Sequence, residues 1–139
     1  MSNLTYKAAL IGAGRIGMLL ENDPKRLKPA THFGMWDDHP KFDLVAVCDP
    51  DPEKLKIAES IRPDIKTYTD SDVMLGEVRP DAISVATWKN SHYDMMRLAL
   101  AHKVPAVVLE KPIAERKDHA LEIVEAAEAQ GMHLLVNHR

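Results

Sequence analysis

The chain has one cysteine and no long apolar run, and each shortage excludes a class of protein. Cys48 has no partner for an internal disulfide, and a cysteine-rich zinc site is excluded as well. Without a run of about 18 apolar residues, no membrane span is expected. The first residues contain no basic stretch leading into the apolar segment of a signal peptide, so the expected location is the cytoplasm.

An excess of positive charge is also missing. The 18 Lys and Arg residues are outnumbered by 21 Asp and Glu, and both signs are mixed along the chain. No basic stretch is interleaved with aromatic residues, so nucleic acid is not an expected partner. His32 and His39 have no acidic partner at metal-ligand spacing, and His102, His119 and His133 fall at helix ends or a strand start, so no metal site is expected. What remains is a chain of 139 residues with an apolar fraction of 45%, which suits one folded domain.

Short apolar runs alternate with helical patterns along the chain. Several runs consist almost entirely of small or β-branched apolar residues, as strands buried on both faces do. They predict strands over residues 7–11, 42–48, 65–68, 82–86, 106–109 and 133–136. Helix signals lie between them, from residue 51 and over 69–78, 91–101 and 114–130. This alternation predicts an α/β Rossmann fold, with a doubly wound, mostly parallel sheet of about six strands and helices on both faces.

The motif Gly-Ala-Gly-Arg-Ile-Gly at residues 12–17 directly follows the first predicted strand. In a dinucleotide-binding unit the first glycine makes the tight turn, and the second lets backbone N–H groups approach a pyrophosphate. The third lets helix and strand pack closely, and the phosphates lie at the helix N-terminus. The alternative is a glycine-rich turn without a ligand.

Prolines interrupt the helix that this motif requires. Pro24 and Pro29 follow the glycines closely, and neither suits a helix interior. We interpret residues 22–30 as an insertion that breaks the first helix after its phosphate-binding turn. The sequence therefore predicts a helix start over residues 15–20, a loop through both prolines, and a second helix capped by Thr31.

An acidic residue, Asp49, ends the second predicted strand. A carboxylate there can accept hydrogen bonds from a ribose of NAD and would repel the 2′-phosphate of NADP. Its distance from the glycines exceeds the usual separation of about twenty residues, and removing the insertion recovers much of the difference. Two alternatives stay open, in which Asp49 is a solvated turn residue or Asp51 takes the ribose role.

Glu110, Lys111 and Pro112 follow the fifth predicted strand. In open parallel sheets, ligands bind at the carboxyl ends of the strands. A lysine there can orient a substrate hydroxyl and share its proton as hydride leaves. The alternative is a surface lysine before a turn.

Five motifs spread over residues 7–139 carry a resemblance to a known family. They are the glycine motif, Val-Ala-Val-Cys-Asp-Pro-Asp at 45–51, Asp-Ala-Ile-Ser-Val-Ala-Thr at 81–87 with His92 after it, Glu-Lys-Pro-Ile-Ala at 110–114, and Leu-Val-Asn-His-Arg at 135–139. The chain resembles the N-terminal domain of the glucose-fructose oxidoreductase, inositol dehydrogenase and rhizopine-catabolism (Gfo/Idh/MocA) oxidoreductases. The Glu-Lys-Pro motif, together with the threonine after the fourth strand, is more specific than the glycines.

The resemblance implies a role for each matching position. Lys111 would be the catalytic lysine that contacts the substrate hydroxyl, a cis peptide bond would precede Pro112, and Glu110 would lie beside a cofactor ribose. Trp88 and Lys89 stand where the family often has proline after the threonine, which weakens the transfer of roles to the far end of that loop. The implied NAD-binding residues are Gly12, Gly14, Arg15, Ile16, Gly17, Asp49, Thr87, Trp88, Asn90, His92, Glu110 and Pro112.

The resemblance also implies an oxidoreductase function. Hydride would pass between NAD and a secondary alcohol of a sugar, polyol or sugar nucleotide. The family's second domain supplies most substrate contacts and usually the interface of a homo-oligomer, and we expect that domain to be absent from these 139 residues. The alternative is a stand-alone NAD-binding or sensing module. Lys111 favours the catalytic interpretation, because binding alone requires no lysine at that strand end.

Overall fold

A six-stranded parallel sheet forms the centre of the molecule. The computed structural model describes residues 4–138, so Arg139 of the last resembling motif lies outside the described residues. The strand order is β3-β2-β1-β4-β5-β6, and every neighbouring pair is parallel. This is the doubly wound order of dinucleotide-binding folds, so the predicted fold class is confirmed. The strands are β1 (Tyr6–Ile11), β2 (Phe42–Cys48), β3 (Lys66–Tyr68), β4 (Ala82–Val85), β5 (Ala106–Glu110) and β6 (His133–Asn137).

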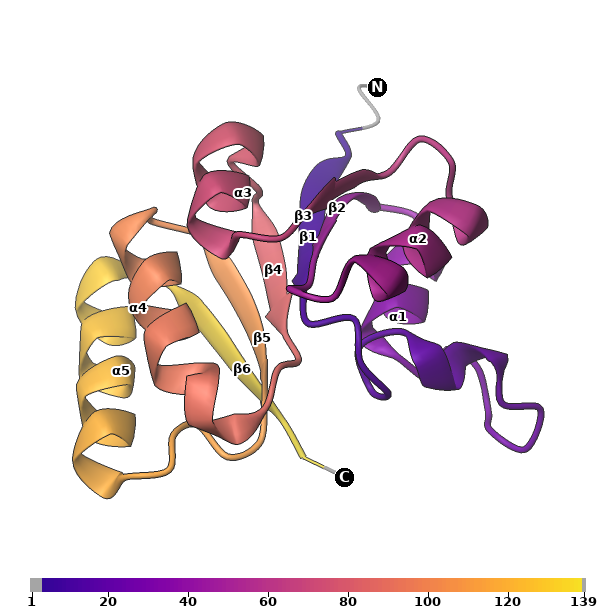
Figure 1. Cartoon of the computed structure of the whole chain (residues 1–139). Coiled ribbons are helices and arrows are strands. Elements are labelled where there is room, and N and C mark those ends of the chain that lie inside the picture. Colours follow the sequence, from indigo (N-terminus) through magenta and orange to yellow (C-terminus); the bar gives the residue numbers. More distant parts are fainter. Residues whose placement is uncertain (1–3, 139) are drawn as a thin grey trace.

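Helices cover both faces of this sheet (Figure 1). In the described range they are α1 (His32–Asp38) and α2 (Pro52–Ile61) on one face, and α3 (Ser71–Val78), α4 (His92–Ala101) and α5 (Lys117–Gln130) on the other. Asp51 caps α2 by accepting from Glu53 N, with Pro52 at the first helical position, and Gly131 ends α5 at φ +72°. The helix predicted from residue 114 begins three residues later, at Lys117.

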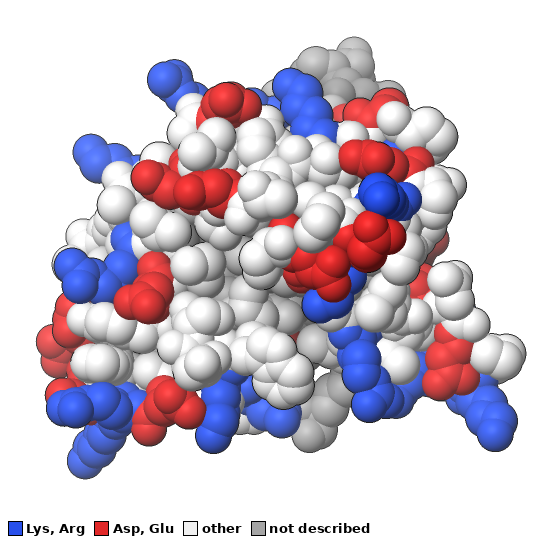
Figure 2. Space-filling view, in the orientation of Figure 1, with Lys and Arg blue, Asp and Glu red and all other residues white. Residues whose placement is uncertain are grey.

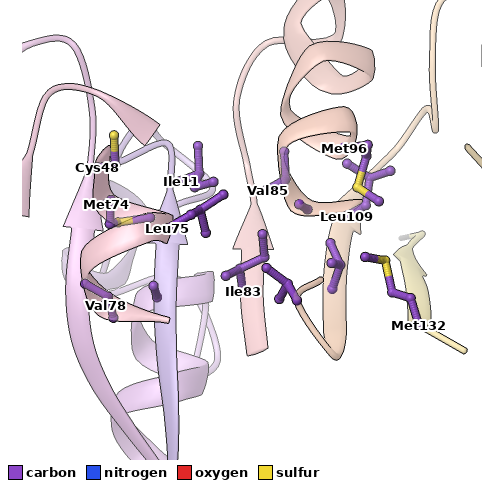
Figure 3. Close-up of a cluster of buried hydrophobic side chains, with 14 of the residues drawn as sticks. Ile11, Cys48, Met74, Leu75, Val78, Ile83, Val85, Met96, Leu109 and Met132 are labelled. Atoms are coloured by element: carbon purple, nitrogen blue, oxygen red, sulfur yellow. The ribbon is translucent and has the colours of Figure 1, made fainter. Parts of the chain in front are cut away.

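Each face of the sheet has its own apolar layer. Figure 3 shows the layer beneath α3 and α4, where Leu75 and Met96 pack against Ile83 and Val85 of β4. Because side chains alternate along a strand, Ala82 and Ser84 of the same strand face α1 instead. A polar and fully buried side chain, Ser84, therefore lies under the first helix.

The chain after the glycine motif departs from the predicted helix. Met18 N donates to Gly14 O four residues back, but Leu19 N and Leu20 N reach five residues back, to the carbonyl groups of Gly14 and Arg15. A short 3₁₀ helix, η1 (Leu19–Asn22), follows. The α-helix predicted over residues 15–20 is therefore wrong in type, because these wider bonds open the turn and let the chain leave the helix axis.

The second helix forms where the sequence predicts it. The chain runs as a loop through both prolines, and α1 then begins with Thr31 as its N-cap. Thr31 Oγ1 accepts the Gly34 N–H at 3.1 Å. A continuous helix over residues 15–38 is thus excluded, and the predicted loop and cap are confirmed.

Backbone hydrogen bonds show that α1 continues the turn started by the glycines. His32 N donates to Ile16 O at 3.2 Å, and Phe33 N donates to Gly17 O at 2.8 Å. In an unbroken α-helix these carbonyl groups would bond residues 20 and 21. His32 and Phe33 take those two places twelve residues later, so residues 20–31 are looped out of an otherwise continuous helix. This segment is slightly longer than the predicted 22–30, and its absence from other members of the family stays a prediction.

Charged side chains fix both ends of the looped-out segment. The Glu21 carboxylate accepts Ala30 N at 3.0 Å, Thr31 N at 2.8 Å and Thr31 Oγ1 at 2.5 Å. Lys28 Nζ donates to the carbonyl oxygens of Glu21 and Asp23 at the end of η1. The loop is therefore an ordered element that returns the chain to the helix axis.

Replacing Glu21 with alanine is expected to lower the free energy of unfolding by about 1–3 kcal/mol, because Thr31 is buried and loses its charged acceptor. Urea unfolding followed by circular dichroism measures the change. Asp23→Ala is the matched control in the same loop, since the Asp23 carboxylate contacts exposed groups, Lys25 N and the Arg26 guanidinium. Equal stability of the Glu21→Ala and Asp23→Ala variants would contradict this account.

Candidate functional site

The glycine motif leaves β1 as a turn with free backbone donors. Gly12 N donates to Cys48 O at 2.9 Å, and Ala13 N donates to Asp49 Oδ2 at 2.9 Å. The next four N–H groups, of residues 14–17, donate to no acceptor within residues 4–138. Successive free donors at the start of a helical turn are the arrangement that binds phosphate. The turn therefore fits the pyrophosphate of a dinucleotide.

The three glycines of the motif serve different purposes. Gly12 has φ +97°, and a Cβ there would lie 2.7 Å from the carbonyl group of Ala86. A Cβ on Gly17 would overlap the carbonyl oxygen of Gly12. Packing thus explains both of these glycines. A Cβ on Gly14 would meet nothing within 4 Å, so packing does not require glycine there, and its contact with a ligand stays a prediction.

Asp49 lies beside this turn at the end of β2. It is buried, with Oδ2 accepting the Ala13 N–H and Oδ1 accepting the Asp51 N–H, each at 2.9 Å. Lys54 Nζ lies 3.9 Å from Oδ2, a neighbour that the sequence did not indicate. Asp49 is therefore no solvated turn residue, since its carboxylate holds the glycine turn, whereas Asp51 is the N-cap of α2. Contact between Asp49 and a ribose stays a prediction.

The looped-out segment accounts for the long separation between the glycines and Asp49. Asp49 lies 32 positions after Gly17 in the sequence. Without the twelve looped-out residues the separation is 20, the spacing usual for this acidic residue in a dinucleotide-binding unit. The helix register thus restores the expected fingerprint.

Cys48 lies next to Asp49, and its side chain faces the apolar layer beneath α3 and α4. Burial raises the pKa of the Cys48 thiol, because a thiolate loses solvation there, and the hydrogen bond to Ser71 Oγ opposes the shift. A buried thiol with a raised pKa is a poor nucleophile at neutral pH. Cys48 is therefore a packing residue.

The loop after β4 carries predicted cofactor residues. Trp88 is 85% exposed, and Asn90 is exposed in the short 3₁₀ helix η2 (Lys89–Ser91). Ser91 Oγ donates to Thr87 Oγ1 at 2.7 Å, which orients the threonine hydroxyl at the strand end. Trp88 and Asn90 are thus accessible to a ligand, and their contact with NAD stays a prediction.

His92 occupies a different position from its neighbours in that loop. Its ring is 1% exposed, with Nδ1 2.7 Å from Pro112 O and Nε2 3.1 Å from Thr87 O. The ring therefore ties the loop after β4 to the loop after β5. Direct contact with a cofactor would require His92 to leave these backbone groups.

Lys111 follows the carboxyl end of β5, beside the β4 loop. Val85 pairs with Leu109, so Thr87 and Lys111 follow neighbouring strand ends. Lys111 is exposed, and its ammonium group has no hydrogen-bond or ion-pair partner among residues 4–138. The peptide bond between Lys111 and Pro112 is cis, as the resemblance implied. A free ammonium group at this edge is able to bind a substrate oxygen.

Glu110 is held on the α1 side of the sheet by Asn137, from the last resembling motif, and by His32, which the sequence did not single out. Its Oε1 accepts from Asn137 Nδ2 at 2.6 Å and lies 2.8 Å from His32 Nε2. His32 Nδ1 lies 2.8 Å from Ser84 Oγ, which also accepts from Trp36 Nε1 at 2.8 Å. The available signal was the Thr31 cap, which places His32 and Trp36 four residues apart on one helix face.

Other features of the molecule do not include the residues assigned to the site. A cavity of about 360 Å³ lies at the amino ends of β4 and β5, and a second of about 340 Å³ lies beside the looped-out segment. On the face drawn in Figure 2, acidic and basic side chains are interspersed.

Among residues 4–138 no three His, Cys, Asp or Glu side chains gather as metal ligands. No helix in that range has the length and apolar character to span a bilayer.

Comparison with known proteins agrees with this geometry. A family model described as oxidoreductase family, NAD-binding Rossmann fold, matches residues 6–138. The D-apiose dehydrogenase of Rhizobium rhizogenes is 28% identical over 137 residues, which cover 99% of this chain and 36% of that protein. The inositol 2-dehydrogenase of Acidothermus cellulolyticus is 33% identical over 127 residues, which cover 91% of this chain and 34% of that protein.

A solved structure shares the same fold. The WlbA dehydrogenase from Bordetella pertussis, crystallised with NADH and UDP-GlcNAcA, matches with a TM-score of 0.79 and 28% identity, covering 96% of this chain and 37% of that one. The chain thus spans about a third of the length of the relatives it matches. Since the family model covers almost every described residue, this chain belongs to the oxidoreductase family with an NAD-binding Rossmann fold, as its resemblance to the Gfo/Idh/MocA oxidoreductases indicated.

Proposed function

We propose that the chain binds NAD along the carboxyl edge of its sheet, as the cofactor half of a dehydrogenase. One observation carries this proposal. The N–H groups of residues 14–17 have no acceptor among residues 4–138, and Gly14 faces open space beside them. A diphosphate suits these donors because it is negatively charged and offers several acceptor oxygens to one helical turn.

A pyrophosphate at the glycine turn sets the direction of the rest of the cofactor. β1 lies between β2 and β4, so the two halves of a dinucleotide extend to opposite sides. The adenosine ribose would lie beside Asp49 at the end of β2. The nicotinamide ribose would lie toward Thr87 and Glu110, which follow β4 and end β5. The Asp49 carboxylate would repel a 2′-phosphate, which favours NAD over NADP.

The position of Lys111 at the end of β5 supports a role in proton transfer. NAD supplies the hydride acceptor when bound. In alcohol oxidation the neutral amine of Lys111 would take the hydroxyl proton as hydride leaves the adjoining carbon, and the ammonium group so formed would hold the carbonyl oxygen. A module that only binds NAD needs no free lysine at this strand end, so Lys111 supports the catalytic proposal.

The substrate class that we propose is a secondary alcohol of a sugar, polyol or sugar nucleotide. Two relatives are named as dehydrogenases of D-apiose and inositol, and the WlbA structure contains UDP-GlcNAcA. Because the chain spans about a third of those proteins, we expect these 139 residues to bind NAD and to oxidise little sugar or polyol alone. Substantial dehydrogenase activity of the purified chain would contradict this division of roles.

Cofactor preference tests the proposed site. In titrations followed by tryptophan fluorescence, the chain is expected to bind NADH more tightly than NADPH. Asp49→Asn removes the repelling charge and is expected to lower that preference roughly tenfold, equivalent to ~1.4 kcal/mol.

Asp51→Asn is the matched control for this titration. It makes the same charge change two residues away, and asparagine caps a helix as well as aspartate does. The preference of this variant should equal that of the unmodified chain. No binding of either cofactor would refute the proposed function, whereas an unchanged preference in Asp49→Asn would refute only the ribose role.

A further inference from the structure

The looped-out segment brings a buried histidine to a specific place in the fold. His32 occupies the helical position of residue 20, the third residue after Gly17 once the loop is left out. The ring is 4% exposed and points into the sheet, between β4 and β5. His32 is thus the side chain that joins the helix begun by the glycine turn to the strand end before Lys111.

The partners of the ring define which nitrogen carries the hydrogen. Trp36 Nε1 only donates, so Ser84 Oγ accepts from it and keeps its own hydrogen to donate. The Glu110 carboxylate only accepts, so Nε2 is the nitrogen that donates and Nδ1 is left to accept the Ser84 hydroxyl at 2.8 Å. The ring hydrogen is then on Nε2 and is donated to Glu110 Oε1, also at 2.8 Å. A chain of hydrogen bonds therefore runs from α1 through β4 and the ring to β5.

Glu110 receives a second bond at the same oxygen. Asn137 Nδ2 of β6 donates to Oε1 at 2.6 Å, and the carboxylate is largely enclosed between these two donors. Hydrogen bonds to a charged group are the stronger ones, and their loss inside a protein is costly. The direction of the Glu110 side chain, one residue before Lys111, is thus set in part by a residue on the first helix.

We propose that His32 is a positioning residue that fixes Glu110 and the nicotinamide side of the cofactor site relative to the glycine turn. This inference rests on the proposed function, since it assumes that NAD extends from the glycine turn toward β5. His32 contacts Ser84 and Glu110 rather than the cofactor. Its loss should affect the nicotinamide half of NAD while the adenosine and pyrophosphate half is retained.

Trp36 provides the matched comparison. It lies one helical turn after His32, is also buried, and donates its single ring N–H to Ser84 Oγ rather than to Glu110. Trp36→Phe loosens the same packing layer without touching the Glu110 link. A general loss of packing would affect both variants alike, whereas positioning of Glu110 separates them.

The experiment compares two ligands on four proteins: the unmodified chain, His32→Leu, His32→Gln and Trp36→Phe. NADH reports on the whole site, and ADP reports on the adenosine and pyrophosphate half alone. His32→Leu is expected to weaken NADH binding roughly tenfold with less than about a twofold change for ADP. His32→Gln keeps a side-chain N–H and should recover most of the NADH affinity. Trp36→Phe should leave the NADH-to-ADP affinity ratio unchanged.

The tautomer of His32 in the unmodified chain is an independent test that needs no variant. Nitrogen-15 NMR of the histidine rings should show His32 with hydrogen on Nε2 and a bare Nδ1. A bare Nε2, which has no hydrogen to donate to Glu110, or equal losses of NADH and ADP affinity in His32→Leu, would overturn the inference. Failure of the unmodified chain to bind both NADH and ADP would instead refute the proposed function on which it rests.

Discussion

Gly14→Ala is expected to weaken NADH binding by roughly 10- to 100-fold while the protein stays folded. The added methyl group would stand in the space where a bound pyrophosphate would meet the free N–H groups, and each lost charge-assisted hydrogen bond contributes about 1.5–3 kcal/mol. The fold should tolerate the change, because the new Cβ meets no atom within 4 Å and Gly14 does not have a positive φ. Fluorescence titration measures the affinity, and thermal unfolding measures the stability.

Gly76→Ala is the control for this substitution. Gly76 lies inside α3, and its added Cβ would meet only His102 Cε1, at an ordinary contact distance of 3.7 Å. NADH affinity should be unchanged, and stability should rise by up to about 1 kcal/mol because alanine favours the helix. If Gly14→Ala bound NADH as tightly as Gly76→Ala does, the open space at Gly14 would have no role in cofactor binding.

Gly17→Ala, in contrast to Gly14→Ala, is expected to cause a large loss of stability. Its Cβ would overlap the carbonyl oxygen of Gly12 and lie 3.0 Å from the adjoining carbon, both of them backbone atoms. No side-chain rotation relieves such a contact, so the turn itself would have to move. We expect the free energy of unfolding to fall by about 3 kcal/mol or more, a large part of the stability of a typical domain.

Urea unfolding of Gly14→Ala and Gly17→Ala side by side gives the measurement. The two variants carry the same chemical change three residues apart, so the difference between them isolates the contact with Gly12. A Gly17→Ala variant within about 0.5 kcal/mol of the unmodified chain would show that the turn is not packed as described.

Local patterns predict most of the fold because they act over neighbouring residues. Apolar runs such as that of β2 give strands, and the Asp51–Pro52 pair gives the start of α2, without information from the rest of the chain. The segment after the glycine motif was predicted less well. Its composition suits a helix, but the prediction could not include the wide hydrogen bonds by which the chain leaves the helix axis at Leu19.

The residues of the candidate site also fall into those that the sequence predicted and those that it did not. The glycine motif, Asp49 and Lys111 were recognisable because each follows a predicted strand and parallel strands end at one edge. His32 was not recognisable, because its partners Ser84 and Glu110 lie 52 and 78 residues away in the sequence. Only the pairing of β4 with β5 under α1 brings these three side chains together.

The sequence by itself determined the order of strands and helices along the chain and the glycine turn with its backbone N–H groups. It also determined the strand ends where Asp49 and Lys111 lie. These features follow from residue type and short-range spacing, which need no knowledge of distant contacts. Tertiary structure decided the register across the looped-out residues, the burial of His92 and the hydrogen-bonded chain from α1 to Glu110. The hydrogen-bond partners of buried polar side chains depend on which strands lie side by side. A buried polar group forms a hydrogen bond with a group that the folded sheet places within about 3 Å of it.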